Sequence, residues 1–167
     1  ANGDVRVTGT TLDNRGVRLV QRGIGRFALT TTGALINTDG GLIGAEGDAS
    51  VIAAAIYNTA GTIFAQAGLQ LSSLGDLINR QGQIQSNGAL TVSAAGSLDN
   101  ADGRIDAGET ATVSAGRIDN VRGQLIAGGV TDNAALAVAT STLDNRGGTL
   151  ASRAADIVLT ATAIDNR

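Results

Sequence analysis

Residues 98–107 read Leu-Asp-Asn-Ala-Asp-Gly-Arg-Ile-Asp-Ala, and the pattern of this stretch returns along the whole chain. Leu or Ile followed two positions later by Asn occurs eight times, at intervals of 20 to 25 residues. The recurring asparagines are Asn14, Asn37, Asn58, Asn79, Asn100, Asn120, Asn145 and Asn166. A period near 20 predicts that each unit is one supersecondary element, which buries its apolar face only against its neighbours.

Each repeat has further fixed positions. Gly stands three positions after the Asn in six of seven units, and Leu or Ile stands five positions after it in every unit. Apolar and polar residues then alternate, as in Leu90-Thr91-Val92. Alternation between Gly-bounded turns is typical of strands. The Gly supplies either a positive φ or the close approach that a sharp corner requires.

The sequence therefore predicts an all-β fold, a right-handed parallel β-helix (β-solenoid) of about 20–21 residues per coil with seven to eight coils. Each coil is expected to hold three short strands and three corners, and to pair in register with the next coil at about 4.8 Å. We expect residues 1–167 to form a single β-helix segment, a fragment of a longer repeat array. Two long intervals predict loop insertions near residues 22–26 and 128–133.

The composition excludes several classes of function. The chain has no Cys and no His, which removes disulfides, thiol chemistry, His-assisted nucleophiles and zinc sites. We therefore expect no enzyme, no cofactor and no metal site. No apolar run is long enough for a membrane helix, so no membrane insertion is expected. With a net charge of −3 and three aromatic residues, the chain also lacks the features of a nucleic-acid-binding protein.

The recurring Asn shares a face with the Leu or Ile two positions before it, so its side chain is expected to point inward. Amides stacked at the spacing of the coils can form a hydrogen-bonded ladder. The alternative is an Asn row that lines a ligand groove.

The residue immediately before each Asn is expected to point outward. It is Asp in the first coil and in the last four, where neighbouring arginines should compensate the stacked carboxylates. Calcium binding is the alternative, although one row of carboxylates supplies few of the six to eight ligands that Ca²⁺ takes.

Two surfaces are candidate binding sites. The outward column changes from Asp to Ile36, Tyr57 and Ile78 in the second to fourth coils, and the position six residues after the Asn adds Ile43 and Phe64. Such an apolar patch indicates either a contact surface or a surface covered by an element outside this chain. The cluster Arg15, Arg18, Arg22 and Arg26 indicates either a site for a sulfated glycan or a solvated edge.

Residues 98–107, 118–127 and 143–150 resemble filamentous haemagglutinin repeats of two-partner-secretion exoproteins, which include adhesins and contact-dependent growth inhibition effectors. Ile36, Tyr57 and Ile78 depart from the Leu-Asp-Asn of these repeats. The resemblance implies export through an outer-membrane two-partner transporter and a secreted or cell-surface location on a Gram-negative bacterium. It implies a structural stalk, whose contacts are the flanking repeats of the same polypeptide. The alternative is a binding module for a receptor protein or sulfated glycan on a host or target cell.

Overall fold

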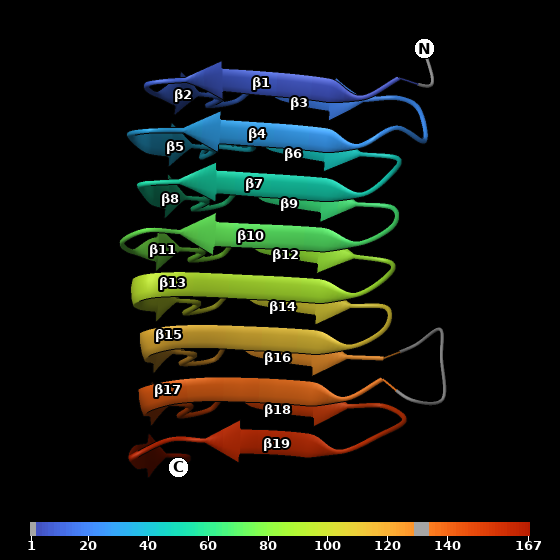
Figure 1. The fold of residues 1–167 in the computed structure, drawn as a ribbon. Coiled ribbons are helices and arrows are strands. Elements are labelled where there is room, and N and C mark those ends of the chain that lie inside the picture. Colours follow the sequence, from blue (N-terminus) through green and yellow to red (C-terminus); the bar gives the residue numbers. More distant parts are fainter. Residues whose placement is uncertain (1–2, 129–133) are drawn as a thin grey trace.

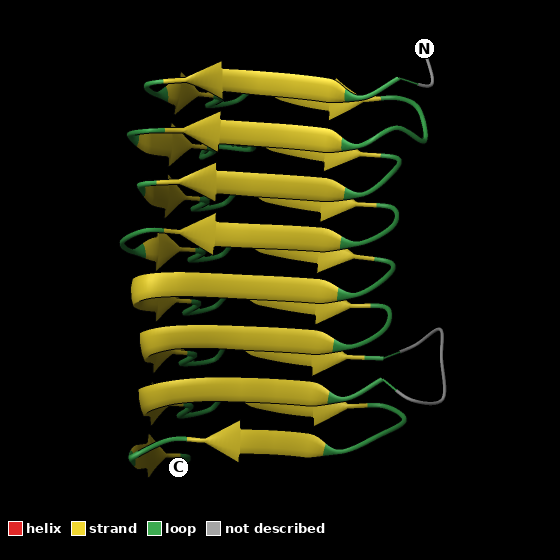
Figure 2. Ribbon diagram, in the orientation of Figure 1, coloured by secondary structure: helices red, strands yellow, loops and turns green. Residues whose placement is uncertain are grey.

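A computed structural model describes residues 3–128 and 134–167 of the chain, and Figure 1 shows these residues as a stack of parallel coils. They form strands joined by short turns and contain no helix (Figure 2). The chain runs along one strand in front, passes behind and returns, so that it turns clockwise as it descends from the N-terminus (Figure 1). This confirms the predicted fold, a right-handed parallel β-solenoid with about 21 residues per coil.

Two sheets form the walls of the solenoid. One has thirteen strands and the other seven, and every pair of neighbouring strands is parallel. The seven-stranded sheet consists of β3 (Arg18–Gln21), β6 (Leu42–Ala45), β9 (Thr62–Ala65), β12 (Gln83–Ser86), β14 (Arg104–Ala107), β16 (Gln124–Ala127) and β18 (Thr149–Ser152).

The thirteen-stranded sheet has two parts in each coil. Its first part consists of β1 (Val5–Gly9), β4 (Phe27–Thr31), β7 (Ala49–Ala53), β10 (Leu69–Ser73) and β19 (Ile157–Thr160). The second part, just before the Asn, consists of β2 (Leu12–Asp13), β5 (Ala34–Ile36), β8 (Ala55–Tyr57), β11 (Leu77–Ile78) and β20 (Ala163–Asp165). In three coils the two parts are continuous, as β13 (Leu90–Asp99), β15 (Ala111–Asp119) and β17 (Leu136–Asp144).

The expectation of three separate strands per coil therefore fails in these three coils. Between β13 and β15 the pairing register shifts between Ala94 and Ser97, as it does at a β-bulge. Bulges bend a strand without ending its ladder, so the chain turns the corner while it remains paired. The residues at the bend, Ala95 and Gly96 in β13, are small.

The core is one continuous column of inward side chains from both sheets. Leu35, Leu71, Leu98, Ile105 and Val113 are fully buried, and Phe27 at 1% exposure is the aromatic ring of this core. Burying a side chain of this size contributes roughly 1.5–3 kcal/mol. Because each coil covers the next, leucine, isoleucine, valine and alanine suffice to fill a thin interior.

The corner after each Asn has a backbone geometry that distinguishes between the two proposed roles of its glycine. The residue two positions after the Asn has a positive φ, 53° at Ala60 and 55° at Gln81, although neither is glycine. In the third to seventh coils the glycine one position later is required for close approach instead. A Cβ at Gly61 would overlap the carbonyl oxygen of Asn37 and stand 2.7 Å from Oδ1 of Asn58.

The second coil has one extra residue in this corner, at Gly40. As a result Ile43, and not Leu42, pairs with Leu19 and Ile63 at the inward position of the sheet. Ile43 is 1% exposed and belongs to the core. Its prediction as an exposed binding residue was wrong, because counting from Asn37 ignored the added residue, which inverts the alternation of faces.

The two predicted insertions differ in what the structure describes. The loop of residues 22–26 joins β3 to β4 and is two residues longer than the loop of residues 46–48, which joins β6 to β7. Of the second insertion, residues 129–133 lie outside the described part of the chain.

Candidate binding surfaces

The eight asparagine side chains form a continuous hydrogen-bonded ladder along the solenoid. The Nδ2 of each Asn donates to Oδ1 of the next, at 2.7 Å from Asn14 to Asn37 and at 2.6 Å from Asn145 to Asn166. Each of the first six Nδ2 atoms also donates to a backbone carbonyl of the following coil, as Asn58 does to Gln83 at 3.1 Å. The middle of the row, including Asn79 and Asn100, is fully buried, so this row does not line a groove.

The outward apolar column consists of Ile36, Tyr57 and Ile78, three residues that pair in register on β5, β8 and β11. Tyr57 is 38% exposed and the two isoleucines are half-buried. Asp13 and Asp99 end the column on either side. We call these three residues the apolar stripe.

Phe64 does not join the apolar stripe. It is half-buried on β9 of the seven-stranded sheet, where its register partners are Gly44 and Gln85. With Ile43 in the core, the five apolar candidates reduce to one stripe of three residues and a separate phenylalanine.

Four of the five carboxylates in the outward Asp column pair with arginines, whereas Oδ1 of Asp119 accepts from the backbone N–H of Val121. Asp144 and Asp165 each accept bidentate hydrogen bonds from the Arg two positions later. The distance from Nη2 to Oδ2 is 2.7 Å both for Arg146 to Asp144 and for Arg167 to Asp165. Asp99 instead accepts from Arg80 of the preceding coil at 2.5 Å. The hydrogen bond from Arg146 holds the pKa of Asp144 below its usual value of 3.8. Within residues 3–128 and 134–167, no three acidic side chains lie close enough together to hold a metal ion.

The Arg cluster does not form one surface. Arg15 makes a 2.5 Å ion pair with Asp13, its neighbour in the outward Asp column. Arg18 lies on β3 of the seven-stranded sheet, and Arg22 lies in the loop before β4. Arg26 directly precedes β4 and lines a basin on the thirteen-stranded sheet.

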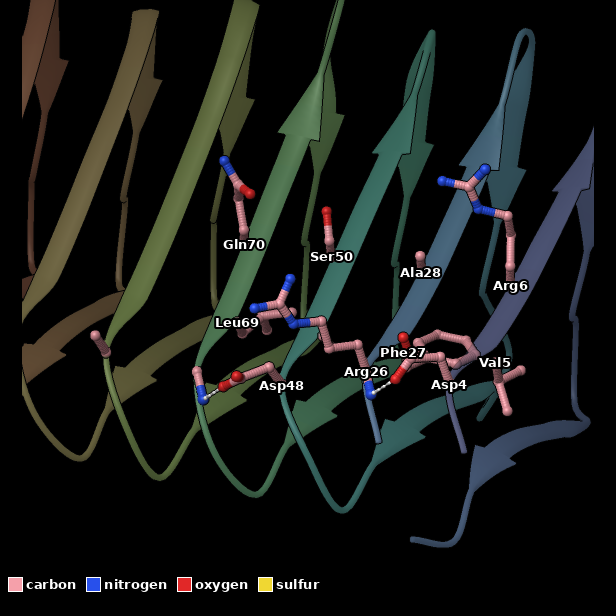
Figure 3. Close-up of a pocket in the computed structure, with 13 residues that line it drawn as sticks. Asp4, Val5, Arg6, Arg26, Phe27, Ala28, Asp48, Ser50, Leu69 and Gln70 are labelled. Carbon is pink, nitrogen blue, oxygen red and sulfur yellow. Dashed lines mark hydrogen bonds between the residues drawn. The ribbon is translucent and has the colours of Figure 1, made fainter. Parts of the chain in front are cut away.

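This basin contains a residue that the sequence reasoning missed. Arg6 of β1 lines it together with Arg26, Asp48, Ser50 and Gln70 (Figure 3). Arg6, Ala28, Ser50 and Gln70 are register partners on successive coils. Aligning the outward positions of these strands would have shown two small residues between two long polar ones.

Taken together, parallel coils of about 21 residues, an internal asparagine ladder and a Gly-closed corner define a structural β-solenoid built from sequence repeats. A model of the haemagglutinin repeat family matches residues 1–39, 25–81, 45–102, 85–142 and 131–167, and the chain therefore belongs to this family. Proteins of the family are typically secreted or surface-exposed. No curated protein and no solved structure matches the chain. No helix in the described residues could cross a membrane.

Proposed function

We propose that this chain is a stalk segment of a large secreted surface exoprotein of a Gram-negative bacterium, with no catalysis of its own. In this proposal a two-partner outer-membrane transporter exports the exoprotein. The flanking repeats continue the solenoid, and the rod holds an adhesive or toxin-delivery region away from the cell.

The observation that supports this role is the unbroken stacking of the coils. The ladder of Asn side chains joins every coil to the next, and the core has no interruption between Phe27 and Leu143 among the described residues. Stability in such a stack comes from nearest-neighbour contacts, so length can be added coil by coil. A rod of this kind is a spacer with a fixed rise of about 4.8 Å per coil.

The test removes whole coils from the exoprotein. Deletion of residues 80–120 joins Asn79 to Val121, the natural successor of Asn120, and removes two coils. The shortened protein should still fold and be presented on intact cells, with a rod about 10 Å shorter by electron microscopy. Deletion of residues 80–110 is the matched control, because it joins Asn79 to Ala111 out of phase and should prevent presentation.

If the segment is a stalk, target-cell adhesion or toxin delivery should also survive the two-coil deletion. If target-cell adhesion or toxin delivery is lost while the shortened rod is still presented on the cell, the segment itself makes an essential contact, and a role as a passive spacer is wrong.

The apolar stripe favours a second candidate function, a docking site for a receptor protein. Ile36, Tyr57 and Ile78 replace the Asp that occupies this outward column in the other coils. Changing all three to Asp extends an existing pattern, so the fold should survive while binding to the target is lost. Phe64→Ser on the opposite sheet is the control. Unchanged target binding by the triple variant would exclude the stripe as the docking site.

A further inference from the structure

The basin on the thirteen-stranded sheet has the size of a small-ligand site. Its volume is about 540 Å³, within the usual range for sites that hold small molecules. Ala28 and Ser50 form its floor, and the longer side chains of Arg6 and Gln70 rise at its two ends (Figure 3). The ends are three strand spacings apart, about 14 Å. A basin closed at both ends suits a compact group more than a polymer that runs along the rod.

The charged groups around the basin make only some of their possible hydrogen bonds and ion pairs within the protein. Oδ1 of Asp4 accepts from the backbone N–H of Arg26 at 2.8 Å, and Oδ1 of Asp48 accepts from that of Gly68 at 2.9 Å (Figure 3). These bonds fix both carboxylates at the rim. Among the described residues, neither Arg6 nor Arg26 makes an ion pair. Both arginines are exposed, and Arg26 extends from the edge of β4 toward β10.

This set of groups provides both donors and acceptors. A guanidinium matches a carboxylate with two parallel hydrogen bonds. The amide of Gln70, the hydroxyl of Ser50 and the second oxygen of Asp48 can exchange hydrogen bonds with hydroxyl groups. No aromatic ring is exposed in the basin, because Phe27 lies beneath it at 1% exposure. The ligand chemistry that fits is therefore polyhydroxylated, compact and singly acidic.

We propose that this basin binds the terminal sugar of a glycan that ends in a carboxylate-bearing residue. Arg6, at the β1 end of the floor and away from Asp48, binds the carboxylate. Arg26, Asp48 and Gln70 bind the hydroxyl groups. This site differs from the apolar stripe and from the Arg cluster, with which it shares only Arg26, and it does not depend on the stalk role.

The test titrates the protein with sialyllactose, whose terminal sugar carries a carboxylate, and with lactose as the neutral counterpart. Chemical-shift changes in NMR spectra should show saturable binding of sialyllactose with a dissociation constant below about 10 mM, a weak affinity that suits a small, open site. Lactose should not bind. Arg6→Gln and Ser50→Gln should each weaken the affinity at least tenfold, the first by removing the guanidinium and the second by filling the floor. Arg18→Gln, on the opposite sheet, should leave the affinity unchanged.

Four results would overturn the proposal. They are the absence of saturable sialyllactose binding, equal binding of lactose, and an affinity that neither basin variant alters while both keep the parent melting temperature. The fourth is competition by a short peptide with a free C-terminal carboxylate at the same concentration as sialyllactose, which would assign the basin to a polypeptide end instead of a sugar.

Discussion

At the scale of single residues, the asparagine side chain determines how each coil is joined to the next. Its Nδ2 group reaches both the next Asn and a backbone carbonyl of the following corner, and the glycine three positions later leaves room for this contact. Leu at the same position would fit the alternation of faces but could not make these bonds. The sequence pattern showed that the Asn points inward, and the buried ladder gives the physical reason for its recurrence.

Asn100→Leu is expected to destabilise the protein by about 1–3 kcal/mol, the cost of leaving buried hydrogen-bonding groups unpaired. Asn79 would lose its acceptor at 2.7 Å, and Oδ1 of Asn120 would lose its donor at 2.7 Å. Urea unfolding measures the change. Asn87→Leu, at an exposed asparagine outside the ladder, should stay within about 0.5 kcal/mol of the parent. Equal stability of the two variants would contradict a structural role for the ladder.

Substitutions at two adjacent residues of one corner should change the stability of the protein in opposite directions. Ala60→Gly should stabilise the protein by about 0.5–1 kcal/mol, since Ala60 has a φ of 53° and the strain of a left-handed residue exceeds the entropic cost of glycine. Gly61→Ala should cost about 3 kcal/mol, because its Cβ would meet Oδ1 of Asn58 at 2.7 Å. Thermal and urea unfolding of the two variants measure the change in stability that each substitution causes. A neutral Gly61→Ala would show that the corner can relax.

At the scale of the elements, the sequence predicted the strands well because alternation and Gly-bounded turns are local signals. The prediction of inward and outward faces failed where one added residue inverts their alternation. Gly40 makes no close contact at its Cβ position, and nothing in its immediate sequence distinguishes it from the corner glycine Gly41. The position of Ile43 depends on pairing with Leu19 and Ile63 in other coils, which is a non-local property.

The same dependence on non-local pairing explains which residues of the binding surfaces could be predicted from the sequence. The apolar stripe was visible in the sequence because its three members occupy one repeat position. Arg6 and Arg26, by contrast, occupy different positions of the repeat and line the same basin only because Arg26 extends along the sheet from the corner before β4. Arg15 looked like part of a basic cluster, but its charge is compensated by Asp13 two residues earlier.

Deletion of Gly40 tests the register directly. The shortened corner has the spacing of the corner after Asn58, so Ile43 should remain in the core and the stability should change by less than about 1 kcal/mol. Deletion of Thr62 is the matched control, because it moves Ile63 to the outer face and should destabilise the stack strongly. Hydrogen exchange of the β6 and β9 amides reports both outcomes. Similar losses of protection in the two deletions would refute the assignment of Gly40 as the extra residue.

At the scale of the whole molecule, exposed carboxylates along the rod link stability to pH. Hydrogen bonds from arginine side chains lower the pKa values of Asp13, Asp102, Asp144 and Asp165, and the backbone N–H of Ser97 lowers that of Asp76. A carboxyl whose pKa is lower in the folded state stabilises the fold above its unfolded value, near 3.8, and this contribution is lost as the pH falls through the folded pKa.

The melting temperature should therefore be nearly constant from pH 7 to about pH 5 and fall below about pH 4. In 1 M salt the fall should be smaller, because the ion pairs are exposed and screened. Asp76→Asn should keep part of the acid sensitivity, because the four carboxyls that accept from arginines still titrate. A melting temperature that rises on acidification below pH 4 would contradict the sign of these shifts.

The ladder of amides also gives the rod a direction. All seven bonds of the ladder run from an Nδ2 donor to an Oδ1 acceptor one coil nearer the C-terminal end, so the amide dipoles add instead of cancelling. A finished coil thus presents an amide donor and a row of unpaired strand groups to the segment that follows it. Pairing with these groups allows the solenoid to be extended one coil at a time, as expected for a repeat array held together by nearest-neighbour contacts.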